Sequence, residues 1–256
     1  MPELPEVEIC AGELSAHLLG KTVRRVTIPD NKIHLPRDLA GHKIADIYRR
    51  GKFIVLQLDD DRRILVHLGM TGGFEFTPPR KYRLVFGTDH DAAYFEDPRR
   101  FGTVRLVSAA QQEKILAKLG PEPLAPGFNL EGLKKTRRPV KVALQDQRLI
   151  AGIGNIYASE SLWRARIHPA RRADRLGEDE SERLRASIVR VLKHAIAYGP
   201  AIYQAQRFMV YGRNGKPCRR CRAPVQRAVL GGRSAYFCPR CQKKVARGLR
   251  RLTQMK

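Results

Sequence analysis

The sequence is poor in acidic residues, and no Asp or Glu occurs at positions 183–256. It also lacks a signal-peptide pattern and any apolar run near the roughly 18 residues that a membrane-spanning helix needs. We therefore expect a soluble, intracellular protein with no membrane partner. Against 25 acidic residues stand 49 Lys and Arg, which gives a net charge of +24 and a pI of about 10.5. This surplus favours a polyanion, and nucleic acid first, as the partner.

Cysteine is also scarce, and five residues in 256 are too few for a disulfide scaffold. Four of them form two Cys-x-x-Cys pairs, which are typical of two knuckles that close a tetrahedral structural Zn²⁺ site on a small hairpin. A redox pair is the alternative, but it needs one pair in a βαβ context. We expect one zinc per chain, and we expect the metal to hold the ribbon folded. The predicted ligands are Cys218, Cys221, Cys238 and Cys241. Cys10 lies on an apolar helical face and is predicted to be buried.

Hydrophobic periodicity divides the chain into a β-rich half and a helical half. An amphipathic helix over 5–19 is followed by short apolar runs at the regular spacing of an antiparallel sandwich or barrel. A helix near 110–119 precedes Gly120–Gly127, whose glycines and prolines are typical of an interdomain linker. Beyond it the period is helical over 129–136, 139–147, 155–165 and 178–198. The predicted strands are 22–28, 43–49, 53–58, 63–68, 82–86, 93–96 and 103–107.

The first residues form a candidate nucleophilic centre. Removal of Met1 would expose the nitrogen of Pro2, with the carboxyl groups of Glu3 and Glu6 close by in sequence. An α-amine has a pKa of about 7.7–8.0, so at neutral pH it is unprotonated far more often than a lysine side chain. Such an amine attacks an aldehyde-like carbon to give an iminium. The alternative is that Pro2 and Pro5 only open the first helix.

A second motif, Ala151-Gly-Ile-Gly-Asn155, places two glycines before a predicted helix. It is no dinucleotide fingerprint, because the third glycine and the βαβ context are missing. We expect a tight turn whose backbone N–H groups and Asn155 side chain meet a phosphate at the helix N-terminus.

Taken together, the motifs of this chain resemble the formamidopyrimidine-DNA glycosylase and endonuclease VIII family, and the opening resembles the formamidopyrimidine branch in particular. The resemblance covers nearly the whole chain. It implies an α+β multidomain fold with an N-terminal antiparallel β-sandwich that carries the first helix, a helix-two-turn-helix domain and a C-terminal zinc-ribbon finger. Damaged double-stranded DNA is the implied partner, and a monomer is expected. The motifs are Pro2-Glu-Leu-Pro-Glu-Val-Glu8, Arg50-Gly-Lys52, His67-Leu-Gly-Met70, Asp97-Pro-Arg-Arg-Phe-Gly102, Leu119-Gly-Pro-Glu-Pro-Leu124, Gly152-Ile-Gly-Asn-Ile-Tyr-Ala-Ser-Glu160, Val210-Tyr-Gly-Arg213 and the four cysteines.

The resemblance also implies a role for each matching residue. Pro2 would attack C1′ of the damaged nucleotide, Glu3 would act as acid and base in sugar-ring opening, and Glu6 would support them. Lys52, which matches a strand lysine, would contact the phosphate beside the lesion, although a solvated charge at a strand edge is the alternative.

The remaining matches concern DNA binding. Met70, Arg99 and Phe101 would fill the gap that the everted base leaves, because a base must leave the duplex to be reached. Without the resemblance, Met70 and Phe101 would be assigned to the core and Arg99 would be assigned to an exposed pair with Asp97. Two further groups, Lys141 with Asn155 and Arg233 on the zinc finger, would face the lesion and its phosphates.

Three segments depart from the family pattern. Only residues 200–209 separate Gly199 from Val210, so the loop that closes over an everted 8-oxoguanine is largely absent. The segment 79–84 replaces the usual polar run, and its contacts do not carry over. Residues from Lys243 onward extend past the usual end, as a basic tail that adds non-specific DNA affinity.

The sequence therefore predicts a base-excision repair enzyme of the cytoplasm and nucleoid, a DNA glycosylase and abasic-site lyase for oxidised or ring-opened bases. One alternative keeps the chemistry but acts on pyrimidine lesions, bulky adducts, crosslinks or abasic sites, and another is a non-catalytic damaged-DNA-binding protein. We expect a catalytic domain over 1–118, a linker over 119–127, a helix-two-turn-helix domain over 128–207, a zinc finger over 208–244 and a tail over 245–256.

Overall fold

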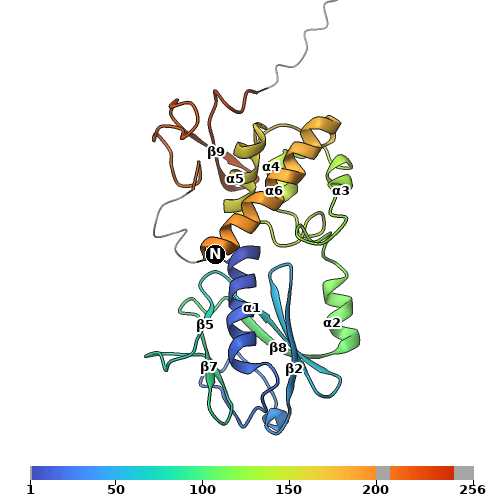
Figure 1. The fold of residues 1–256 in the computed structure, drawn as a ribbon, viewed down its shortest axis with the longest axis vertical. Coiled ribbons are helices and arrows are strands. Elements are labelled where there is room, and N and C mark those ends of the chain that lie inside the picture. The colour runs from blue at the N-terminus through green and yellow to red at the C-terminus, as the bar shows by residue number, and fades with distance from the viewer. Residues whose placement is uncertain (1, 200–207, 245–256) are drawn as a thin grey trace, which may run out of the picture.

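The computed structural model describes residues 2–199 and 208–244, in two lobes that meet at a waist (Figure 1). The lower lobe holds helix α1 (Leu4–Leu18), two sheets and helix α2 (Ala109–Leu116), and the upper lobe holds the remaining helices and a hairpin. The start of the chain lies at the waist. Two expectations fall outside the described residues, namely most of the shortened loop (200–207) and the basic tail (245–256).

Two antiparallel four-stranded sheets form a sandwich in the lower lobe. Their strand orders are β1-β6-β7-β5 and β2-β3-β4-β8, and the apolar core between them draws side chains from both. The predicted sandwich is confirmed. The strands are β1 (Arg25–Thr27), β2 (Ile44–Arg50), β3 (Phe53–Leu58), β4 (Arg62–His67), β5 (Gly73–Glu75), β6 (Leu84–Gly87), β7 (Ala92–Glu96) and β8 (Thr103–Ser108), with a short 3₁₀ turn at Arg37–Leu39.

Strand β3 is apolar on both faces because both faces are covered. Ile54 and Leu56 point into the core of the sandwich. Val55 points the other way, into a smaller cluster with Leu65 of β4 and Leu116 of α2. Successive residues of a strand face opposite sides, so this continuous apolar run requires packing on both.

Helix α1 belongs to both lobes. Val7, Leu14 and Leu18 lie in the core of the sandwich, whereas Leu4 lies in the core of the upper lobe. The backbone N–H of Leu4 donates to the carbonyl of Gly152, 3.0 Å away. The first turn of α1 therefore ties the two lobes together.

The linker is a packed joint. Arg50 donates to the carbonyls of Leu119 and Gly120 at 3.1 and 2.7 Å, and Glu122 accepts from Arg49 and Arg50. A Cβ atom on Gly120 would lie 2.5 Å from the carbonyl carbon of Leu149. The segment thus breaks regular structure, as its composition predicts, yet it is fixed to the lobes on either side.

Helices α5 (Asn155–Ala165) and α6 (Glu178–Tyr198) pack against each other and have the predicted bounds. Helices α3 (Glu131–Lys134) and α4 (Val140–Leu144) are shorter than predicted, and a 3₁₀ turn lies at Ala173–Arg175. The start of α4 is fixed because Val140 and Lys141 donate to the carbonyls of Arg171 and Pro169. The hairpin consists of β9 (Gln226–Leu230) and β10 (Arg233–Phe237).

The β-rich half also differs from expectation in two places. The run 22–28 keeps only three strand residues, because Thr22 forms an isolated bridge with Lys43 instead. Strand β5 was missed, since a three-residue strand that begins with glycine has no readable alternation. Cys10 is 7% exposed and its burial raises the pKa of the thiol to about 12, so the predicted buried thiol is confirmed.

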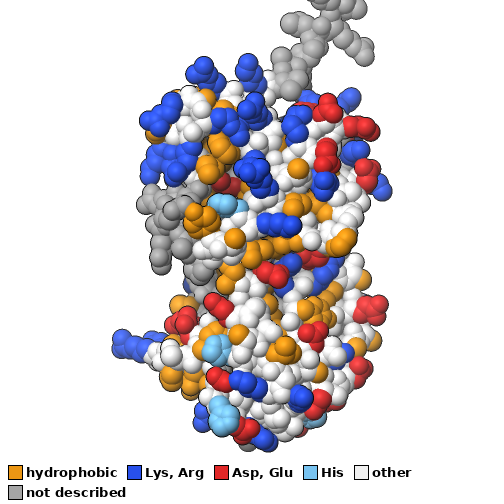
Figure 2. Space-filling view, viewed as in Figure 1, with side chains coloured by type: hydrophobic (Ala, Val, Ile, Leu, Met, Phe, Trp, Pro, Cys, Tyr) orange, Lys and Arg blue, Asp and Glu red, His pale blue; other side chains and the backbone are white. Residues whose placement is uncertain are grey.

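Charge is unevenly spread over the surface. Figure 2 shows Lys and Arg side chains gathered over the top and left of the upper lobe, with acidic side chains mainly along its right edge and on the lower lobe. Within the described residues, no helix is long and apolar enough to cross a membrane.

Candidate active site and nucleic-acid interface

Glu3 lies buried at the waist, at the N-terminus of α5. Its carboxylate accepts hydrogen bonds from the backbone N–H groups of Gly154, Ile156 and Tyr157, at 2.7, 2.8 and 3.2 Å. The side chain is 1% exposed, and this burial raises the pKa of Glu3 despite the nearby Lys52 charge. A raised pKa favours the protonated form of the carboxyl group, which is the form that a general acid needs.

The two glycines of the turn before α5 make room for the N-terminal residues. A Cβ on Gly154 would lie 2.4 Å from Cδ of Glu3, and a Cβ on Gly152 would lie 2.7 Å from Cβ of Leu4. Gly152 also has a φ of +82°, a value that L side chains rarely adopt. The expectation of a phosphate on these backbone N–H groups is therefore wrong, because the chain's own carboxylate occupies the helix N-terminus.

Pro2 and Glu6 lie beside this buried acid. Glu6 accepts from the backbone N–H of Glu3 at 2.8 Å and from the Tyr157 hydroxyl at 2.5 Å. The first of these bonds is part of a capping box, and Pro5 sits in the first turn of α1, so the helix-opening interpretation holds for Pro5, whereas Pro2 lies before the N-cap residue Glu3. Pro2 and Glu6 line a cavity of about 160 Å³ with Ile9, Cys10, Glu13, Leu68, Gly72, Gly73, Phe74 and Gly199.

Three cations converge on the same place from three different elements. Lys52 lies in the turn between β2 and β3, so it is not a strand residue, and it is half-buried, so it is not a solvated edge charge. Burial lowers the pKa of both Lys52 and Lys141, and Arg233 of β10 lowers it further, while Glu3 acts in the opposite direction. The pKa of Lys141 falls to about 8. Like charges held this close favour an anion as the missing partner.

Asn155 lies within this cluster. Its Oδ1 accepts from Lys141 Nζ at 2.6 Å, and its side chain bonds to that of Tyr211. Lys141 also donates to Gln145 at 3.3 Å. The hydrogen bond joins Asn155 to Lys141, and no phosphate is needed to complete the turn behind Asn155.

Met70, Arg99 and Phe101 form a separate, exposed group on two loops of the lower lobe. Met70 is 38% and Phe101 55% exposed, so neither belongs to the core. The Arg99 guanidinium lies over the Phe101 ring, 5.0 Å from its centroid. The alternative that pairs Arg99 with Asp97 is wrong, because the Asp97 carboxylate accepts from Thr71, Arg83 and the N–H of Gly102.

A buried ionic network holds these loops. Arg83 joins Asp97 to Asp30, at 2.9 and 2.5 Å, and Arg100 also pairs with Asp30. These contacts lower the pKa of both aspartates although burial opposes them. Arg83 therefore gives the unusual segment 79–84 a structural role. A Cβ on Gly69 would lie 2.5 Å from the Gly102 nitrogen, so the two loops touch directly.

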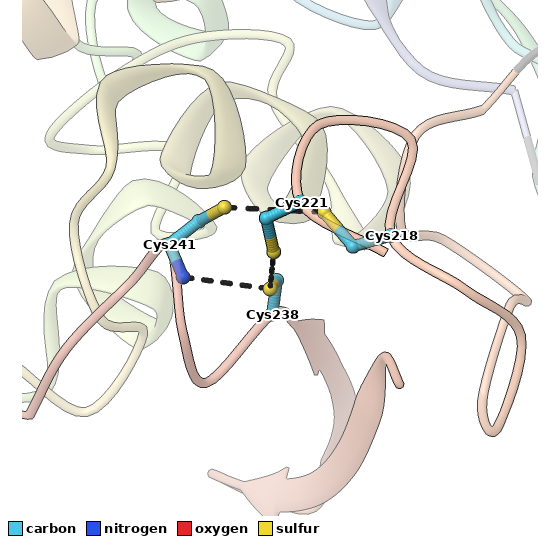
Figure 3. A group of neighbouring side chains, drawn as sticks. All are labelled: Cys218, Cys221, Cys238 and Cys241. Atoms are coloured by element: carbon cyan, nitrogen blue, oxygen red, sulfur yellow. Dashed lines mark hydrogen bonds between the residues drawn. The ribbon is translucent and has the colours of Figure 1, made fainter. Parts of the chain in front are cut away.

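The four predicted cysteine ligands point toward one another (Figure 3). Their sulfur atoms all lie within 4.8 Å, with Cys221 and Cys238 3.4 Å apart and Cys218 and Cys241 3.9 Å apart. A tetrahedron with Zn–S bonds of about 2.3 Å has S···S edges of roughly 3.8 Å. The arrangement fits one structural Zn²⁺.

The zinc-ribbon finger is fixed to α5 and its C-terminal end. Trp163 donates its indole N–H to the sulfur of Cys218 at 3.4 Å, and Gln242 donates to the carbonyl of Ile167 at 2.8 Å. Gly231, in the hairpin turn, touches Val142 of α4. These contacts hold Arg233 near Lys141.

Sequence reasoning assigned no role to two residues of this framework. Glu160 is 5% exposed, and its carboxylate accepts the N–H groups of residues 209, 210 and 211 at 2.8–2.9 Å. Tyr157 holds Glu6. Both lie inside the motif Gly152–Glu160, and the available signal was that Glu160 is the one acidic residue of α5.

Comparison with known proteins matches most of this chain to one family. Residues 1–104 match the formamidopyrimidine-DNA glycosylase N-terminal domain, 119–207 match its H2TH domain, and 215–244 match the zinc finger found in FPG and IleRS. The formamidopyrimidine-DNA glycosylase of Thermus thermophilus is 42% identical over 90% of this chain and 94% of its own length. The Geobacter sulfurreducens enzyme is 40% identical over 90% and 96%.

Solved structures agree. The crystal structure of MutM (Fpg) from Thermus thermophilus has a TM-score of 0.86 and 40% identity over 94% of this chain and 98% of that one. A complex of Lactococcus lactis Fpg with FAPY-dG-containing DNA has a TM-score of 0.87 and 34% identity over 94% and 100%.

Proposed function

This chain belongs to the formamidopyrimidine-DNA glycosylase family, and on that premise we propose that Pro2, Glu3 and Glu6 are its catalytic centre. The protein is a DNA glycosylase with abasic-site lyase activity that acts on oxidised bases in base-excision repair, and damaged double-stranded DNA is its partner. It acts in the cytoplasm, on the nucleoid. Its domains are 1–118, 128–207 and 208–244, with a linker over 119–127 and a tail over 245–256.

Pro2 is the nucleophile once Met1 is removed. Its amine attacks C1′ of the damaged nucleotide, the base departs, and an iminium links Pro2 to the opened sugar. The iminium withdraws electrons, so the C2′ proton becomes acidic and the 3′ phosphate leaves by β-elimination. A second elimination releases the 5′ phosphate, and hydrolysis frees Pro2.

Glu3 supplies the proton that opens the sugar ring. Its buried position supports this role, because the raised pKa keeps a proton on the carboxyl group at higher pH than an exposed glutamate would. The three backbone donors at the start of α5 then stabilise the carboxylate that remains. Glu6, held by Tyr157, orients the chain around Pro2.

The surrounding cations position the DNA. Lys52, Lys141 and Arg233 face one another without enough carboxylate to balance them, so the phosphates at the lesion complete the cluster. Asn155 orients Lys141. The exposed Met70, Arg99 and Phe101 enter the duplex and offset the cost of eversion of the base. The zinc, when bound, is structural and holds Arg233 in place.

The observation that carries this proposal is the buried Glu3 carboxylate at the N-terminus of α5, next to Pro2. Pro2→Gly and Glu3→Gln should each slow strand cleavage at a lesion by at least about a thousandfold, or ~4 kcal/mol. Duplex affinity should change by only a few-fold, because both residues act in the transition state.

Borohydride trapping on lesion-containing duplexes tests the roles separately. The unaltered protein should form a covalent adduct, and protein that retains Met1, in which the Pro2 nitrogen is an amide, should not. An equal loss of binding and cleavage, with a lowered Tm, would assign both residues a structural role only.

A further inference from the structure

A second pocket lies between α5 and α6. It shares Tyr157 with the framework of the catalytic centre, but Pro2, Glu3 and Glu6 do not line it. Its volume is about 220 Å³, several times the roughly 30 Å³ of one water and below the ~300–1,000 Å³ of a small-molecule site. It therefore suits one large side chain. The lining residues are Tyr157, Glu160, Trp163, Arg164, Arg190, Val191, His194, Phe208 and Met209.

Three arginines crowd the rim of this pocket. The guanidinium of Arg220 lies over the Trp163 ring, 4.1 Å from its centroid, and donates to the carbonyls of Trp163 and Arg164. Burial lowers the pKa of Arg164, and the charges of Arg190 and Arg220 lower it further. Arg190 and Arg220 are therefore each close enough to Arg164 to repel it, and a carboxylate beside Arg164 would be stabilised.

The chain has little negative charge to offer them. Among the described residues, Arg164, Arg190 and Arg220 form no ion pair. Glu160 lines the pocket, but its carboxylate accepts three backbone N–H groups and its burial raises its pKa. Positions 183–256 contain no Asp or Glu, so neither 200–207 nor 245–256 can supply one.

The pocket faces away from the proposed DNA site. Arg164 is nine residues after Asn155 on α5, which is two and a half turns, or ~14 Å along the axis and the opposite side of the helix. Lys141 and Arg233 lie on the Asn155 side. A duplex bound on the Asn155 side leaves this rim uncovered.

We propose that this pocket docks an acidic peptide of a partner protein, with a bulky apolar side chain in the pocket and carboxylates on Arg164 and Arg190. Charge complementarity requires an anion, and the walls formed by Trp163 and Met209 require an apolar group beside it. A DNA backbone offers the anion but no apolar group. Trp and Arg are also the residue types most enriched at the centres of protein interfaces.

Fluorescence anisotropy with a fluorescein-labelled acidic peptide that carries one central tryptophan tests the proposal. Saturable binding is expected, and Arg190→Gln or Arg164→Gln should weaken it about tenfold. Arg183→Gln is the matched control, because Arg183 is exposed on the same face of α6, two turns before Arg190, and it should change affinity less than twofold. A peptide with alanine for tryptophan should bind at least about tenfold more weakly.

Cleavage of an abasic duplex is measured on the same variants. Unchanged cleavage with weakened peptide binding supports the proposal, and it does so whatever residues carry the catalysis. No saturable peptide binding would overturn it. So would equal affinity for the alanine peptide, or a loss of duplex affinity in Arg190→Gln as large as the loss for peptide, since the rim would then be a DNA surface.

Discussion

Gly154→Ala tests whether the turn before α5 exists to seat Glu3. The added Cβ would lie 2.4 Å from Cδ and 2.5 Å from Oε1 of Glu3, closer than real Cβ atoms approach other heavy atoms. Something must therefore shift. The neighbouring backbone belongs to the start of α5, so we expect the Glu3 carboxylate to be displaced.

The displacement breaks hydrogen bonds to a charged group and misplaces a catalytic acid. Each bond from Gly154, Ile156 or Tyr157 to the carboxylate contributes about 1.5–3 kcal/mol, so the loss of one or two lowers the free energy of unfolding by roughly 3 kcal/mol. A shift of ~1 Å in a catalytic group costs about a hundredfold in rate. Single-turnover cleavage should therefore slow by at least about a hundredfold.

The assay is single-turnover cleavage of an abasic duplex, with Tm measured alongside. Gly12→Ala is the control, because a Cβ there meets nothing within 4 Å and the residue is exposed on α1. It should leave the rate unchanged and stabilise the helix by about 0.5–1 kcal/mol. If Gly154→Ala cleaves at the rate of the unaltered protein with an unchanged Tm, the turn has another purpose.

Three further results are expected. Chelation of the metal, or Cys238→Ser, should release about one zinc per chain, unfold the ribbon and weaken DNA binding. Metal analysis and fluorescence anisotropy follow these changes, and a metal-free protein with normal DNA affinity would contradict the prediction. The pKa of Lys141 is lowered to about 8 in the free protein, so above that pH the side chain must take up a proton when it binds a phosphate. Affinity for a stable abasic-site analogue should therefore fall by up to about tenfold per pH unit above about pH 8. Lys141→Gln should flatten this dependence of affinity on pH. With only ten residues over 200–209, excision of 8-oxoguanine opposite cytosine should be at least about tenfold slower than cleavage at a ring-opened purine or an abasic site; equal single-turnover rates would show that another segment recognises the base.

Local patterns were enough to predict most elements of this fold, although β5 was missed. The periods of α5 and α6, the strand spacing and the paired cysteines each depend on neighbours in sequence, and each is present as expected. Local patterns fail where contacts between residues far apart in the sequence determine which side chains pair. Without the resemblance Asp97 would be paired with the nearby Arg99, but it pairs with Arg83, which directly precedes β6 and also reaches Asp30.

The turn before α5 shows the same limit at the catalytic centre. Glycines at a helix N-terminus indicate an anion, and here the anion is the carboxylate of Glu3, which lies 151 residues from Gly154. No local rule distinguishes that carboxylate from a phosphate. These contacts also fix the N-terminal residues to the upper lobe, because Leu4 lies in its core and Glu3 caps α5. Pro2 is therefore fixed to the helical lobe, although its own helix packs on the sandwich, and any opening between the lobes must move the nucleophile or break its anchor.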